Sequence, residues 1–354
     1  MSSSLTPLIT ISGCTFVREG RRFIIRGVVY QPLRRAGRVF KVEDLDPLRD
    51  ERLDDLRKDI LLLNELGVNT IKVYTLLPAL SHDAAFEALA AAGIYVIVGL
   101  STPQKCINRL KPYESYTAEL LRHYFRTVDC VSQYRNVLGV VAGDHVINNS
   151  KTTQAAEVLR AVIRDVKIHM KRQHQLKDQR LLVVGIADEV FPASSTDSID
   201  YFTAGDKDEQ IDFYSFVNYD QATDPPSHWA ASVQRFAGRG LPIFVSEYGS
   251  NMIRPRPFYE TASLHSPNVT RVLSGGFAYE FADGPNRYGL VTADHQKLED
   301  FDNLKARLHQ VIQEGNDAAI DLEQSATMHH ADFPLVSASW QASSEIPTFQ
   351  LFPQ

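Results

Sequence analysis

The residues best suited to chemistry lie at the ends of predicted strands, and Glu247 is the first of them. Five consecutive apolar residues, 241–245, predict a short buried strand that ends in the sequence SEYG at residues 246–249. A carboxylate at the tip of an apolar strand is costly unless it is paired or used. Glu247 is therefore either a catalytic carboxylate or a structural one that accepts hydrogen bonds from backbone N–H groups at a turn.

A second ionisable pair, Asp144 and His145, follows the predicted strand 137–142. The ordinary histidine pKa of about 6.5 suits proton transfer near neutral pH, and an anionic Glu247 nearby would favour the imidazolium. Because adjacent strand residues normally face opposite sides, at most one of the pair is expected in the site. These three residues could also converge on a divalent cation, but their spacing does not favour that alternative, and no metal site is predicted.

Tyrosines and amides gather at the remaining strand ends. A tyrosine at the mouth of a barrel offers a flat apolar face and a polar tip, which suits a hydroxyl-rich substrate, although any single one could simply cover the core. The candidate substrate-binding residues are Tyr30, Gln31, Tyr74, Asn218, Tyr219, Tyr248, Tyr279 and Tyr288.

The elements that must position these residues alternate between strands and helices. Strands are expected at 9–12, 15–18, 22–30, 69–75, 94–100, 137–142, 181–186, 211–218, 242–247 and 275–280, and helices at 54–66, 83–92, 116–133, 153–170, 227–236 and 298–313. This alternation requires a mostly parallel sheet, and eight such strands after an N-terminal hairpin favour a closed (β/α)8 TIM barrel. Residues 1–314 are expected to form the barrel, and residues 315–354 an irregular C-terminal extension that packs on it through Phe333, Trp340 and Phe349.

Composition narrows the class of protein. The 354 residues carry a net charge of −6, and no basic run suggests a nucleic-acid partner. The N-terminus has no signal-peptide pattern, the C-terminus has no anchor pattern, and three cysteines make no disulfide framework. A cytoplasmic protein without a membrane anchor or cofactor is therefore expected, with Cys106 and Cys130 as buried, inert thiols.

Several segments resemble glycoside hydrolase family 72, the fungal β-1,3-glucanosyltransferases that remodel cell-wall glucan. The segments are IIRGVVYQP (24–32), NTIKVYT (69–75), HDAAFEALAAAGIYVIVGLSTP (82–103), YRNVLGVVAGDHVINN (134–149), AVIRDVK (161–167), DFYSFVNYD (212–220), VSEYGSNMIRPRPFYE (245–260), VLSGGFAYEF (272–281) and YGLV (288–291). They follow the order of the family over most of its catalytic domain.

The resemblance implies a retaining barrel enzyme with two catalytic glutamates, at the ends of strands four and seven. In such enzymes one carboxylate attacks the anomeric carbon, and the other protonates the leaving oxygen and then deprotonates the acceptor. Glu247 matches the nucleophile, and Gln31 matches a polar residue of the sugar cleft. The aromatic positions of the cleft match Tyr74, Tyr219 and Tyr279. No metal is implied.

The chain departs from the family at the second carboxylate. His145 stands where the acid/base glutamate is expected, and Asp144 stands where an asparagine steadies the sugar. Gly99 replaces an aspartate, and Leu56 occupies the place of one disulfide cysteine. Because general acid–base catalysis contributes about 10²–10⁴-fold, glucan transfer is predicted to be weak or absent.

Three hypotheses about function follow. The favoured one is an enzyme repurposed inside the cell, a pseudoglycosidase in which His145, Glu247 and Asp144 perform acid–base chemistry on a small molecule in a tyrosine-lined cavity. That chemistry would be an elimination, isomerisation or cyclisation. The second is an inactive glucan-binding pseudoenzyme, whose altered site is a loss without replacement. The third is a true glucanosyltransferase that acts on β-1,3-glucan oligosaccharides with His145 or Asp144 as the acid.

Overall fold

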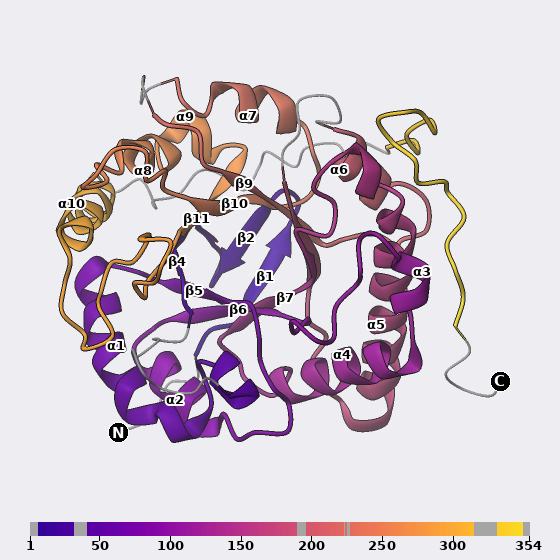
Figure 1. Cartoon of the computed structure of the whole chain (residues 1–354), viewed down its shortest axis with the longest axis horizontal. Helices are drawn as coiled ribbons and strands as arrows, with labels where there is room; N and C mark the ends of the chain where they lie inside the picture. Colours follow the sequence, from indigo (N-terminus) through magenta and orange to yellow (C-terminus); the bar gives the residue numbers. More distant parts are fainter. Residues whose placement is uncertain are drawn as a thin grey trace.

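Eight parallel strands form a closed barrel at the centre of the protein (Figure 1). The computed structural model describes residues 6–31, 41–189, 196–222, 224, 227–314 and 331–349. The barrel strands are β4 (Ile25–Val29), β5 (Thr70–Val73), β6 (Tyr95–Gly99), β7 (Val137–Asp144), β8 (Val184–Asp188), β9 (Phe213–Asn218), β10 (Ile243–Tyr248) and β11 (Leu273–Ala278). They pair in chain order, and β11 closes the ring against β4. The predicted (β/α)8 barrel is confirmed.

Helices surround the barrel and cover the outer faces of its strands (Figure 1). The α-helices are α1 (Leu53–Leu66), α2 (Asp83–Ala91), α3 (Pro112–Ser115), α4 (Ala118–Val131), α5 (Ala155–Lys177), α6 (Asp197–Thr203), α7 (Ala230–Phe236), α8 (Tyr259–Leu264), α9 (Pro267–Thr270) and α10 (Glu299–Gln313). Short 3-10 turns are η1 (Val42–Leu45), η2 (Asp50–Arg52) and η3 (Ser150–Thr152). In α1, Leu56, Ile60 and Leu63 are buried at helical spacing, so the apolar stripe read from the sequence is the face that packs inward.

A hairpin at the N-terminus lies under the barrel. It consists of β1 (Ile9–Ser12), β2 (Thr15–Arg18) and β3 (Arg21–Phe23), which pair antiparallel as a separate sheet. Phe16 of this hairpin is fully buried, and its ring centroid lies 6.2 Å from that of Phe213 and 6.1 Å from that of Phe244. Both partners lie near the starts of their strands, so the hairpin closes the end of the barrel opposite the strand tips.

The predicted bounds of one strand are wrong in a way that matters for the site. The apolar run 181–186 predicts a strand, but β8 begins at Val184 and ends at Asp188. Leu181 is 49% exposed and lies outside the sheet. Because the strand starts later than its apolar run, its tip carries the acidic residues Asp188 and Glu189 rather than Ile186.

The C-terminal segment 331–349 packs on the helix layer. Trp340 is fully buried, and its ring centroid lies 5.3 Å from that of Tyr201 on α6. The backbone N–H of Ser343 donates to Oε1 of Glu157 on α5 at 2.7 Å. Residues 315–330 and 350–354 lie outside the described residues, and the proposed division of the chain at residue 314 stays a prediction.

The cysteines differ from expectation. Cys14, Cys106 and Cys130 are all free thiols. Cys106 is exposed and Cys130 is only partly buried, so the prediction that both are buried is wrong. Cys106 lies in the loop between β6 and α3, outside the helices and strands that form the core. Within the described residues, none of the helices combines the length and the apolar character needed to span a bilayer.

Candidate active site

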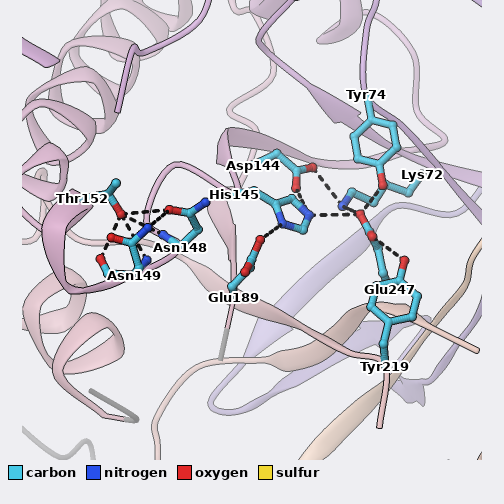
Figure 2. Close-up of polar contacts among 10 residues, drawn as sticks. All are labelled: Lys72, Tyr74, Asp144, His145, Asn148, Asn149, Thr152, Glu189, Tyr219 and Glu247. Atoms are coloured by element: carbon cyan, nitrogen blue, oxygen red, sulfur yellow. Dashed lines mark hydrogen bonds and ion pairs between the residues drawn. The ribbon is translucent and has the colours of Figure 1, made fainter. Parts of the chain in front are cut away.

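Glu247 lies on β10 at the mouth of the barrel and is 5% exposed. The Tyr219 hydroxyl donates to its Oε2 at 2.7 Å, and the Tyr74 hydroxyl donates to its Oε1 (Figure 2). Hydrogen bonds to the charged form favour ionisation of a carboxyl group. Glu247 is therefore a fixed, buried anion that faces the interior of the site.

Lys72, in the middle of β5, supplies a cation beneath Glu247. Its Nζ lies 2.9 Å from Oδ2 of Asp144 and 3.6 Å from Oε1 of Glu247 (Figure 2). The same Nζ lies 4.7 Å from the ring centroid of Tyr74. Sequence analysis missed this residue because NTIKVYT was treated as a strand and a family segment, and only Tyr74 was taken from it as a site residue. The available signal was a charge two residues before Tyr74, on the same face of that strand.

His145 follows the last residue of β7 and has a left-handed backbone, with φ of 53°. Its Nε2 lies 3.2 Å from Oε1 of Glu247 and 3.2 Å from Oδ1 of Asp144 (Figure 2). The prediction that only one of Asp144 and His145 would face the site is wrong. The left-handed residue ends the alternation of the strand, and such strained backbone is typical of functional sites.

Charge fixes the protonation states of the central pair. Burial lowers the pKa of His145, but its hydrogen bond to Glu247 and the charge of Asp144 outweigh burial and raise the pKa to about 9. Burial raises the pKa of Glu247, but the hydrogen bond from His145 and the charge of Lys72 outweigh it, and the pKa falls below its ordinary value. At neutral pH the site therefore holds an imidazolium against a carboxylate.

Glu189 contacts the second ring nitrogen of the imidazole. Its Oε1 lies 3.2 Å from Nδ1 of His145, so that ring nitrogen and Nε2 each have a carboxylate partner. A carboxylate that accepts a hydrogen bond from one ring nitrogen orients the ring and keeps that nitrogen protonated. Glu189 was missed because the predicted strand stopped at residue 186, three residues before it. The acidic residues after the apolar run were the available signal.

Gly99, at the end of β6, leaves no room for a side chain. A Cβ at this position would lie 2.4 Å from the backbone oxygen of Tyr74. The aspartate that the resemblance implies here therefore does not fit this backbone, and the glycine allows β5 and β6 to lie close together next to Tyr74.

Three of the predicted tyrosines form an aromatic cluster beside Glu247. The ring centroid of Tyr219 lies 6.0 Å from that of Tyr279 and 5.7 Å from that of Tyr288, and those two lie 5.3 Å apart. Gln31 lines a cavity of about 230 Å³ together with Tyr279. Flat rings next to a carboxylate suit the apolar faces of a sugar.

Other predicted substrate-binding residues lie elsewhere. Tyr30 is 2% exposed and donates to Oδ2 of Asp59 on α1 at 2.7 Å. Tyr248 is 1% exposed, and its hydroxyl accepts a hydrogen bond from Thr261 on α8 at 3.3 Å. Both predictions are wrong, because residues adjacent to Gln31 and Glu247 point to the opposite side of the strand, into the helix layer. Asn218 caps its own loop by accepting from the backbone N–H of Asp220 at 2.9 Å.

Three side chains that could bind a metal ion lie together, but their negative charge is already compensated by Lys72. Ligand atoms of Asp144, His145 and Glu247 lie within 4.8 Å of one another. The Lys72 ammonium contacts both carboxylates, and a divalent ion would have to displace it and deprotonate His145. The arrangement is therefore better described as an ion-pair network than as a metal centre.

The comparisons with known proteins agree with this geometry. Residues 1–312 match the family described as glucanosyltransferase, glycoside hydrolase family 72. The 1,3-beta-glucanosyltransferase gel1 of Aspergillus fumigatus is 38% identical over 308 residues, covering 85% of this chain and 65% of that protein. The 1,3-beta-glucanosyltransferase GAS5 of Saccharomyces cerevisiae is 34% identical over 98% of this chain and 70% of its own length. The chain thus spans about two thirds of the length of these relatives.

A solved structure agrees as well. Saccharomyces cerevisiae Gas2p in complex with laminaripentaose superposes with a TM-score of 0.86 at 32% identity. The alignment covers 97% of this chain and 77% of that one.

Proposed function

Because the chain belongs to the glucanosyltransferase family, glycoside hydrolase family 72, we propose that it transfers β-1,3-glucan oligosaccharides slowly, with Glu247 as nucleophile and His145 as acid and base. The relatives are named for this transfer, and Gas2p binds laminari-oligosaccharides. One observation carries the proposal: Nε2 of the His145 imidazolium lies 3.2 Å from Glu247, while Glu189 holds Nδ1 at 3.2 Å.

In the first step, a carboxylate oxygen of Glu247 forms a bond to the anomeric carbon as the glycosidic bond breaks. The leaving oxygen takes the proton from Nε2 of His145, so the products are a glycosyl ester on Glu247 and a neutral imidazole. This division of work is that of a retaining enzyme in which an imidazolium replaces the carboxylic acid.

In the second step, an acceptor hydroxyl attacks the anomeric carbon, its proton passes to His145, and Glu247 leaves as a carboxylate. The pKa of His145 helps here, because the Glu247 charge that raises it is absent in the ester. A lower pKa in the intermediate makes the imidazole a suitable base, and the returning carboxylate restores the acid.

The experiment is a transfer assay with reduced laminari-oligosaccharides, in which mass spectrometry detects elongated products. The wild type is expected to elongate acceptors, and Glu247→Gln is expected to abolish transfer. His145→Gln should lower the rate by about 10²–10⁴-fold. Glu189→Gln, which keeps the hydrogen-bonding shape but removes the charge, should lower it less and move the basic limb of the pH profile to lower pH.

His145→Glu is the matched control, because it places a carboxylic acid at the same position. A silent wild type with an active His145→Glu variant would overturn the proposal and identify a glucan-binding protein that has lost its acid. Silence of both proteins would remove glucan as the substrate.

Glucan binding without turnover is a second candidate, and one observation favours it. Oε1 of Glu247 contacts Tyr74, His145 and Lys72 at once, and each contact stabilises the anion and weakens it as a nucleophile. Calorimetry that detects laminaripentaose binding, together with a silent transfer assay, would select this candidate. None of the relatives reported above is named for chemistry on a small metabolite, so the cytoplasmic small-molecule enzyme of the sequence analysis stays an untested prediction.

A further inference from the structure

A second constellation of reactive side chains lies in the helix layer. Sγ of Cys130, near the end of α4, lies 3.8 Å from Nδ1 of His82, the residue that precedes α2. Nε2 of His82 lies 2.8 Å from Oδ2 of Asp46, which follows η1. A thiol, an imidazole and a carboxylate in this order have the spacing by which proteins activate a nucleophile.

The imidazole of this constellation is firmly held. His82 is 1% exposed and Asp46 is fully buried. Asp46 also accepts from the backbone N–H of Leu48 at 2.9 Å and from that of Leu77 at 2.7 Å, so its carboxylate cannot turn away. His82 can therefore present only Nδ1 to the sulfur.

Cys130 is partly buried, and it lines a cavity of about 350 Å³ between α2 and α4. None of the residues that line this cavity contacts Glu247, Asp144 or His145. The constellation is thus separate from the glucan site.

A thiolate anion at this sulfur would have one cation directly beside it and several negative groups nearby. Burial lowers the pKa of His82, but its hydrogen bonds to Asp46 and Cys130 outweigh burial and raise the pKa to about 9. Against the anion stand the carbonyl end of α4 and three carboxylates, which are Asp129 on α4, Asp83 on α2 and Asp50 on η2.

The three carboxylates have other partners. Asp129 pairs with His169 at 2.9 Å, and Asp83 accepts from the Tyr134 hydroxyl at 2.7 Å. Asp50 accepts from the Ser81 hydroxyl at 2.6 Å. Arg126, one turn before Cys130 on α4, adds a further cation to the cavity lining. The imidazolium is the cation that reaches the sulfur itself.

We propose that Cys130 is a nucleophilic thiolate, paired with the His82 imidazolium, which reacts with small electrophiles and in particular with hydroperoxides. The sulfur forms a bond to the terminal oxygen of the peroxide, and the O–O bond breaks. The sulfur loses two electrons and becomes a sulfenic acid, and the peroxide gains them. The alkoxide or hydroxide that leaves takes a proton from His82.

The test compares the three free cysteines of the same folded chain. The protein is treated with limiting iodoacetamide between pH 5 and 9, and peptide mass spectrometry gives the alkylation rate of each cysteine. Cys130 is expected to react at least 10-fold faster than the exposed Cys106 at pH 6. A Cys106 that reacts faster than Cys130 at every pH would overturn the proposal.

A second arm tests the class of electrophile. Equimolar hydrogen peroxide followed by dimedone should label Cys130 and leave Cys106 unlabelled, and the reverse pattern would overturn the hydroperoxide assignment. Cys106→Ser is the matched control and should leave the Cys130 rates unchanged. His82→Gln should remove the advantage at pH 6, and the wild-type comparison decides the matter even if that variant fails to fold.

Discussion

At the scale of the residue, the site is a balanced set of buried charges. Lys72 and His145 supply two cations, and Asp144 and Glu247 supply two anions. Removal of one member of such a network leaves an uncompensated buried charge, which costs more stability than replacement of the whole network by apolar residues. Substitutions at these positions should therefore preserve size and polarity if they are to report on chemistry rather than on folding.

His145 makes stability depend on pH. Its pKa is about 9 in the folded protein, and about 6.5 is the ordinary value that applies after unfolding. A group whose pKa is raised by folding stabilises fully below the unfolded value and loses that contribution as the pH rises through the folded value. The melting temperature, followed by scanning fluorimetry, should therefore fall between about pH 6.5 and pH 9.

His145→Gln should reduce the slope of the curve in that window, and the remaining slope should come from His82, whose pKa is also raised to about 9. Asp188 is the control for other buried groups, because burial raises its pKa to about 7. Its contribution to stability is lost as the pH rises from the ordinary carboxyl pKa to about 7, below the window in which His145 acts. Asp188→Asn should leave the loss between pH 7 and 9 in place. An unchanged slope in His145→Gln would mean that the histidine is not paired as described.

At the scale of the element, the sequence patterns predict the order and type of strands and helices but not where each strand ends. The apolar run of β8 begins before the sheet does, because Leu181 is apolar yet exposed at 49%. Because the predicted strand ended at residue 186, Glu189 was not recognised as a residue at the strand end. Lys72 was overlooked because periodicity describes a strand's faces without saying which charge on the inner face is functional. Tyr30 and Tyr248 were misplaced because strand tips were treated as sites without regard to alternation.

The three candidate catalytic residues were predicted more successfully. Asp144, His145 and Glu247 were predicted from strand ends and from the resemblance, and the structure brings all three together. Their convergence depends on the closed barrel, in which all parallel strands end at one rim. The pairing of His145 with Glu189 could not be predicted, since it requires a left-handed residue after β7 that no propensity indicates.

Gly99→Ala tests the contact between β5 and β6. Because an added Cβ would lie 2.4 Å from the Tyr74 oxygen, the strands must separate, and overpacking of this kind costs about 1–3 kcal/mol. Denaturant unfolding should show this loss, and transfer activity should fall as Tyr74 shifts from Glu247. Gly284→Ala is the control, because its nearest contact is the Asn286 side chain at 3.5 Å. Equal stability of the two variants would contradict the close approach.

At the scale of the whole molecule, segments far apart in the sequence seal the barrel and its helix layer. The N-terminal hairpin inserts Phe16 beneath the barrel, and the segment 331–349 lays Trp340 against α6. The sequence indicated the hairpin from short β-rich runs and the C-terminal segment from its aromatic residues. It could not indicate which helices receive them, since that depends on contacts between residues 139 positions apart, such as Tyr201 and Trp340.

Trp340→Ala tests whether the C-terminal segment is part of the folding unit. Removal of a fully buried tryptophan should cost about 3–5 kcal/mol and should lower the melting temperature of the whole chain in a single transition. Leu335→Ala, in the same segment but 88% exposed, should change stability by less than about 0.5 kcal/mol. A stable Trp340→Ala variant would show that the segment is dispensable for folding.

The N-terminal hairpin that closes the barrel has a further consequence for how such proteins diverge. The aromatic cluster of Phe16, Phe213 and Phe244 lies at the strand starts, away from the rim that carries Glu247. A lineage can therefore exchange rim residues while the cluster keeps the barrel folded. A change such as the histidine at 145 then leaves the packing of this cluster undisturbed. Related proteins of this fold should therefore differ more often at the position of His145 than in the cluster of Phe16, Phe213 and Phe244.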